Sequence, residues 1–93
     1  MIPYAMAFPG GSAYAMARDV AEGYLLVTER VFKTMSRSDL DQVIFEIDRY
    51  LRELRGEQPP LDDVPALQQR QRRMQRLNNA LLIVRSYRAK QKI

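Results

Sequence analysis

The sequence predicts an all-α protein in which an antiparallel pair of helices is followed by a longer C-terminal helix, with an extended arm at the N-terminus. Three observations lead to this prediction. Apolar residues recur every three or four positions along three segments, which is typical of helices with one buried face. Prolines and glycines gather between those segments and mark their ends. A chain of 93 residues is too short for two separate cores, so residues 12–93 are expected to form one helical domain.

The arm is predicted over residues 1–11, which contain two prolines and two adjacent glycines. Side chains alternate between two sides of an extended backbone, so Tyr4, Met6 and Phe8 would point the same way. Chain termini hold a fixed conformation only when they are tied down. We therefore expect these three side chains to anchor the arm, either on a second copy of the chain or as a lid on the same one.

The first helix is predicted over residues 13–35, beginning after Ser12, whose side chain can cap it. Gly23 falls inside this segment, where glycine weakens a helix by about 1 kcal/mol relative to alanine. Two interpretations of Gly23 remain open, namely a tolerated weak point or the close approach of a second helix. The apolar stripe of this segment is wide and runs through Ala13, Ala17, Val20, Tyr24, Val27 and Val31.

The second helix is predicted over residues 39–55. Ser38 and Asp41 resemble a capping box, Asp39 lies in the first turn, and Gly56 stands where a C-terminal glycine cap is typical. Phe45 lies off the apolar stripe among charged residues, so we expect an exposed aromatic side chain that can contact another protein. The stripe itself comprises Leu40, Val43, Ile44, Ile47, Leu51 and Leu54.

The third helix is predicted over residues 65–90, after a stiff loop that contains Pro59 and Pro60. Pro65 is tolerated in the first turn of a helix. Beyond residue 79, Ile83 and Tyr87 add a second apolar face to the main stripe, so this half of the helix is apolar on several sides. Such a helix needs more than one neighbour, and we therefore expect a homo-oligomer, with a dimer favoured.

Charge is unevenly distributed, although the formal net charge is only +4. Residues 1–63 carry 7 basic and all 11 acidic residues, a balance of −4, whereas residues 64–93 carry 8 basic residues and no acid, a balance of +8. This basic segment could contact nucleic-acid phosphates or an acidic protein partner, or it could face the acidic second helix of the same or a neighbouring subunit. The residues proposed for such contacts are Arg72, Arg73, Arg76 and Lys90.

A helix-turn-helix arrangement receives little support from this pattern. The motif needs a turn of three or four residues and a second helix that can approach phosphates. The helix over residues 39–55 carries more acidic than basic residues, and the loop before residue 65 is long and contains two adjacent prolines. Any contact with DNA would therefore come from an isolated basic helix.

Catalysis has little support in the composition, because the chain contains no cysteine and no histidine. It lacks a cysteine nucleophile, a histidine general base and the imidazole and thiolate ligands of most transition-metal sites. We therefore expect no enzymatic activity, no catalytic or metal-binding residues, no cofactor and no small-molecule substrate. No apolar run approaches the length of a membrane span, and residues 1–17 lack the basic start of a signal peptide, so a cytoplasmic location is expected.

The favoured function is a non-catalytic interaction or assembly module that self-associates and docks an acidic partner through its basic C-terminal helix. The alternative is a small nucleic-acid-binding protein that contacts phosphates through the same basic residues. The residues assigned to self-association are Tyr4, Met6, Phe8, Phe45, Ile83 and Tyr87.

Overall fold

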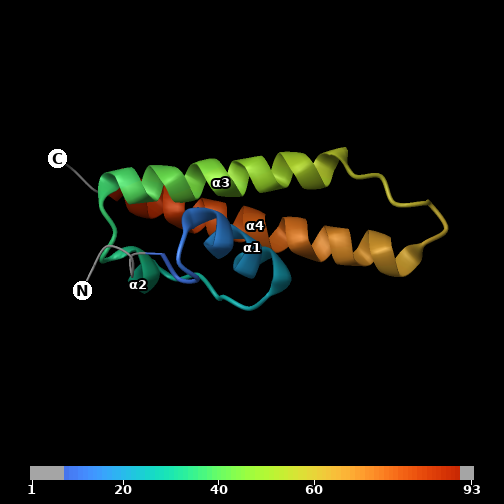
Figure 1. Cartoon of the computed structure of the whole chain (residues 1–93), viewed down its shortest axis with the longest axis horizontal. Coiled ribbons are helices and arrows are strands. Elements are labelled where there is room, and N and C mark those ends of the chain that lie inside the picture. Colours follow the sequence, from blue (N-terminus) through green and yellow to red (C-terminus); the bar gives the residue numbers. More distant parts are fainter. Residues whose placement is uncertain (1–7, 91–93) are drawn as a thin grey trace.

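A computed structural model describes residues 8–90, whose regular structure is entirely helical. Its helices are α1 (Ala13–Glu22), α2 (Glu29–Phe32), α3 (Arg37–Gly56) and α4 (Val64–Lys90). Figure 1 shows α3 and α4 lying side by side in opposite directions, joined by a loop at one end of the molecule. Helix α1 packs against both of them, and α2 packs against α4. The all-α prediction is confirmed.

The hydrophobic core lies between α1, α3 and α4. No charged or polar residue is buried within the described range. On α3 the predicted stripe is correct, because all of its members are buried except Ile44, which is half-buried against the core. On α4 the buried residues are confined to the C-terminal half and are Leu77, Ala80, Leu81 and Val84.

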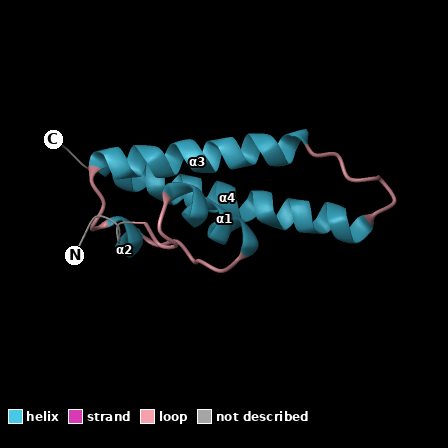
Figure 2. Cartoon of the chain, in the orientation of Figure 1, coloured by secondary structure: helices cyan, strands magenta, loops and turns pink. Residues whose placement is uncertain are grey.

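The prediction of a continuous helix over residues 13–35 is wrong. Helix α1 ends at Glu22 because Gly23 adopts a left-handed conformation, with φ 85° and ψ 10°. The backbone N–H of Tyr24 donates to the carbonyl oxygen of Asp19 over 2.8 Å, which closes a glycine cap of the Schellman type. The chain is then non-helical to Thr28, and α2 adds a single turn. Figure 2 shows this connection over residues 23–28 as a loop.

The break at Gly23 also shortens the first helix of the predicted pair, although α1 still packs against α3. The sequence predicted an antiparallel pair formed by the first two helices, whereas the long antiparallel pair is α3 with α4 (Figure 1). The physical reason is length, since α1 has 10 residues and α3 has 20. The shorter α1 packs against α3, and α4 contacts α3 from Asp41 near its start to Leu54 near its end.

Helix α3 begins two residues earlier than predicted. Ser36, and not Ser38, is the N-cap, because its Oγ accepts a hydrogen bond from the Asp39 N–H over 3.1 Å. The Asp39 carboxylate accepts in return from the Ser36 N–H over 3.0 Å. The sequence contains two overlapping Ser-x-x-Asp patterns, and only the first closes a capping box. Asp41 of the second pattern is therefore left for a contact with α4.

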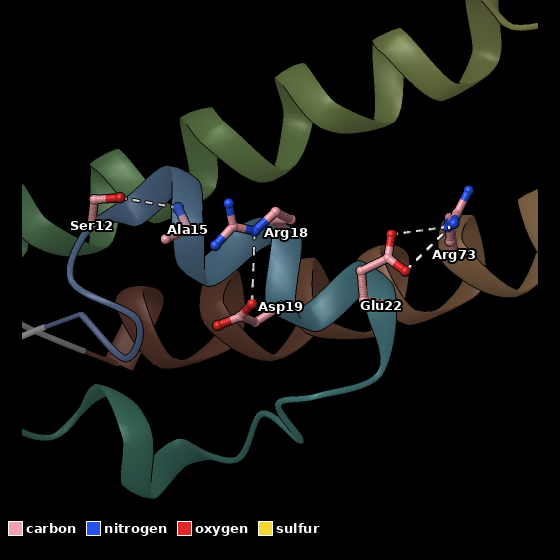
Figure 3. Close-up of polar contacts among 6 residues, drawn as sticks. All are labelled: Ser12, Ala15, Arg18, Asp19, Glu22 and Arg73. Atoms are coloured by element: carbon pink, nitrogen blue, oxygen red, sulfur yellow. Dashed lines mark hydrogen bonds and ion pairs between the residues drawn. The ribbon is translucent and has the colours of Figure 1, made fainter.

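The other predicted helix ends are confirmed within one residue. Ser12 caps α1, and its Oγ accepts from the Ala15 N–H over 3.0 Å (Figure 3). Helix α3 ends at Gly56, and α4 begins at Val64 with Pro65 in its first turn. Asp63 accepts a hydrogen bond from the Ala66 N–H over 3.2 Å at the start of α4.

Residues 1–7 of the predicted arm, including Tyr4 and Met6, lie outside the described residues. Residues 8–12 form turns, with Gly10 and Gly11 at φ values of 88° and 98°. Phe8 is half-buried and packs against the core of its own chain. Among the helices of residues 8–90, none has the length and hydropathy of a membrane-spanning segment.

Candidate functional site

The four predicted basic contact residues all lie on α4, but three of them already contact the same chain. Arg73 Nε lies 3.2 Å from Glu22 Oε2 at the end of α1, as Figure 3 shows. Lys90 Nζ lies 2.7 Å from Glu29 Oε2 of α2. Arg76 Nη1 donates to the carbonyl oxygen of Ala21 over 2.9 Å. These contacts reduce the basic surface that is available to a partner.

Arg72 is the exception among the four. Its side chain is exposed, and it makes no ion pair with any residue between 8 and 90. A guanidinium group carries five N–H donors and holds its charge at any physiological pH. Neither Arg72 nor Arg76 pairs with a carboxylate of residues 8–90, and Arg72 is the one that can bind a carboxylate without also sharing its donors with a helix end.

Two further ion pairs join α4 to α3. Arg85 Nη2 lies 3.2 Å from Asp48 Oδ2, and Arg88 pairs with Asp41. The hydrogen bond from Arg88 holds the pKa of the Asp41 carboxyl below its ordinary value, and the same contact raises the pKa of Arg88. Of the interpretations that the uneven charge left open, the structure realises the one in which the basic helix faces acids of its own chain.

Arginines of α4 also bind the C-terminal ends of the other helices. Arg70 Nε donates to the carbonyl oxygen of Leu54 over 2.7 Å, at the end of α3. Arg76 makes the equivalent contact with Ala21 at the end of α1. The last carbonyl oxygens of a helix have no partner within it and carry its negative dipole, so a guanidinium group there is favourable. These two arginines therefore hold α1 and α3 on α4.

A groove of about 460 Å³ opens between the connection over residues 23–28 and the middle of α4. The polar side chains among its lining residues are Arg76 and Asn79, and no acidic residue between 8 and 90 lines it. Two of the lining side chains are strongly exposed, Leu26 at 85% and Leu82 at 68%. Gly23 also lines the groove, and the apolar lining comprises Val20, Leu25, Leu26, Val27, Ala80, Leu82 and Ile83.

Of the residues predicted for self-association, four lie within the described range, and Phe45 is the exposed one among them. Ile83 is half-buried and lines the groove. Tyr87 is half-buried on the core, with its ring centroid 6.0 Å from that of Phe32, and Phe8 also packs inward. Phe45 is 56% exposed, as predicted, but it lies on α3, which contributes no residue to the groove. Tyr4 and Met6 lie outside the described residues.

Leu26 and Leu82 line the groove, and the sequence analysis assigned neither of them to a contact. The signal that could have found the groove is the run Tyr24-Leu25-Leu26-Val27 directly after Gly23. Four consecutive apolar residues cannot all face the core from one helix, whereas a non-helical connection can bury some and expose others.

The titratable groups with shifted pKa values lie outside the groove. Burial, and then the nearby carboxylate of Glu22, raise the pKa of the Tyr50 hydroxyl. Asp41 and Arg88 shift each other through their ion pair. Within residues 8–90, no three acidic side chains gather closely enough to hold a metal ion. The groove therefore offers apolar contact and arginine N–H donors as its chemistry.

Comparisons with protein-family models, with curated protein sequences and with solved structures find no match to this chain.

Proposed function

We propose that the protein is a non-catalytic interaction module that self-associates through the groove between residues 23–28 and α4. The observation that carries this proposal is the exposure of Leu26 and Leu82, which flank one apolar groove. Single exposed leucines are common on protein surfaces, but large apolar side chains that share one concave surface are typical of sites that bind another polypeptide. Burial of each leucine would contribute about 1.5–3 kcal/mol.

The groove supports self-association better than the residues that the sequence assigned to it. Phe8 and Tyr87 already pack against the core of their own chain, so they have little apolar surface to offer. Phe45 remains a rival surface, since it is exposed on α3 away from the groove. An experiment on the groove must therefore include Phe45 as a comparison.

Light scattering after size exclusion tests this proposal on the full chain over a wide range of concentrations. The wild-type protein is expected to exceed the mass of one chain at high concentration and to do so in high salt as well, because apolar association persists there. Leu82→Glu should lower the association constant by about tenfold or more. Gln42→Glu adds the same charge to an exposed position on α3 and should leave association unchanged.

Two results would contradict the proposal. A wild-type protein that keeps the mass of one chain at every concentration does not self-associate. Association that Phe45→Glu abolishes and Leu82→Glu leaves intact would move the interface from the groove to the outer face of α3. Circular dichroism of each variant shows whether it retains the helical fold.

The nucleic-acid alternative receives less support, because Arg73, Arg76 and Lys90 are engaged within the chain. A protein that neutralises several phosphates loses affinity steeply as salt increases. Titration of a labelled DNA duplex at low salt is expected to show no saturable binding. Binding that weakens steeply with salt and is reduced in Arg72→Ala would favour this alternative instead.

A further inference from the structure

We propose that the groove binds the loop over residues 57–63 of a second copy, so that the chains associate head to tail. This inference rests on the proposed function and names the occupant of the same groove. In the bound arrangement, Leu61 of one copy enters between Leu26 and Leu82 of the next, and Asp62 lies against Arg72.

The loop over residues 57–63 combines an exposed apolar side chain with acidic side chains, which complement the apolar and basic lining of the groove. Leu61 is 87% exposed, and Val64, three residues further along the chain, is 53% exposed. The segment over residues 57–63 contains three acidic residues and no basic one. Asp62 and Glu57 are exposed and make no ion pair with any other residue of the described range. The loop is therefore an apolar tip with uncompensated negative charge.

The receiving face of α4 has the opposite charge. Residues 72, 76, 79 and 83 are three or four positions apart and so share one side of the helix. Along this side of α4, the two arginines and the apolar part of the groove lie within about 16 Å of each other. Arg76 makes a single hydrogen bond, to Ala21, and Arg72 makes no ion pair among residues 8–90. Arginine is well suited to carboxylates, because its N–H groups can donate to both oxygens.

A second copy must supply the loop, since the loop of the same chain cannot reach. Val64 at the start of α4 and Ala80 in the groove are separated by about 24 Å along a continuous helix. Figure 1 shows the loop at one end of the molecule, beyond the end of the α3–α4 pair. The other acidic residues offer no comparable surface, because Glu22, Glu29, Asp41 and Asp48 already pair within their own chain.

Head-to-tail association predicts that two variants that cannot associate alone will associate when they are mixed. A symmetric groove-to-groove dimer does not predict this. Leu61→Asp removes the apolar tip and leaves the groove intact. Leu82→Glu alters the groove and leaves the tip intact. Each variant alone is expected to keep the mass of one chain. An equal mixture is expected to reach the mass of two chains and no more, since one intact tip and one intact groove form a single contact.

Light scattering of the full-length variants, alone and mixed, tests the inference. A mixture that stays at the mass of one chain, while the wild type associates and Leu82→Glu does not, overturns the head-to-tail contact and leaves self-association through the groove standing. A wild type that never associates overturns both. Full association of Leu61→Asp alone also overturns the inference, because the groove then holds a different surface.

The charge contact is tested by a second pair of substitutions. Arg72→Glu and Asp62→Arg should each weaken wild-type association about two- to fivefold or more, because like charges would face each other across the contact. The double variant restores opposite charges and is expected to recover most of the loss. Arg52→Glu on α3 is the control, since Arg52 is exposed and lies outside the groove. Failure of the double variant to recover would overturn the pairing of Arg72 with Asp62.

Discussion

The guanidinium group of Arg76 packs against Gly23 at the end of α1. The Arg76 Cζ atom lies 3.1 Å from the point that a Cβ on Gly23 would occupy, and Arg76 Nη1 donates to the carbonyl oxygen of Ala21 over 2.9 Å. The absence of a side chain at residue 23 lets the guanidinium group approach the last turn of α1. The same side chain lines the groove, so the cap of α1 and the wall of the groove are built together.

Replacing Arg76 by alanine should therefore destabilise the fold. The carbonyl oxygen of Ala21 would lose its charged donor, and hydrogen bonds to charged groups contribute about 1.5–3 kcal/mol when buried and less at a partly exposed site such as this one. We expect the free energy of unfolding to fall by about 1 kcal/mol in urea titrations followed by circular dichroism. Arg52→Ala is the matched control and should change it by less than about 0.5 kcal/mol.

Replacing Gly23 by alanine should also destabilise the protein. Gly23 has a φ of 85°, which an L-residue adopts at a cost of about 1–2 kcal/mol, and the added Cβ would press on Arg76. Gly56→Ala is the control, because a Cβ there meets no atom of residues 8–90 within 4 Å and Gly56 lies in the last turn of α3 at a negative φ. Urea titration should show a loss for Gly23→Ala and no loss for Gly56→Ala. Equal effects would contradict the role assigned to the left-handed cap.

The bounds of the long helices were predictable where several local signals agree. Helix α4 has an acidic cap at Asp63, a proline in its first turn and a long apolar stripe, and its bounds follow within one residue. The residues around Gly23 gave conflicting signals. The stripe through Val20, Val27 and Val31 continues across the glycine at helical spacing, and Val27 is buried although its backbone is not helical. Periodicity alone cannot distinguish these two ways of burying the same residue.

The groove was less predictable than the helices because it depends on the break. Ile83 was identified as a contact residue, but Leu26 enters the groove only when the chain leaves α1 at Gly23. The ion pairs of α4 were also not predictable, because Arg73 and Glu22 are 51 residues apart and nothing in their local sequence links them. Segregation of charge between the two parts of the chain indicated that such pairs could form, but not which residues would form them.

Substitutions at Ser36 and Ser38 distinguish the two overlapping capping patterns of α3. Ser36→Ala removes the acceptor for the Asp39 N–H and should lower the free energy of unfolding by about 1 kcal/mol. Ser38 lies inside the first turn, where alanine is the better helix former, so Ser38→Ala should be neutral or slightly stabilising. Thermal unfolding of both variants checks this. A larger loss of stability for Ser38→Ala than for Ser36→Ala would place the start of α3 at residue 39.

The ion pair between Asp41 and Arg88 predicts a specific dependence of stability on acid. Because the pKa of Asp41 is lowered in the folded state, mainly by the hydrogen bond from Arg88, the unfolded state binds more protons as the pH falls below the ordinary value of 3.8. The stabilisation is therefore complete above that value and is lost as the pH falls through the lowered pKa.

Asp41→Asn cannot titrate at this position, so its stability should fall less steeply than that of the wild type when the pH is lowered from neutral to about 2. Arg88→Gln should flatten the same part of the curve, because without the donor the pKa of Asp41 returns toward its ordinary value. Melting temperatures recorded across this range compare the three proteins, and the remaining carboxylates contribute equally to all of them. Acid curves that run parallel for the wild type and both variants would show that the pair does not form in solution.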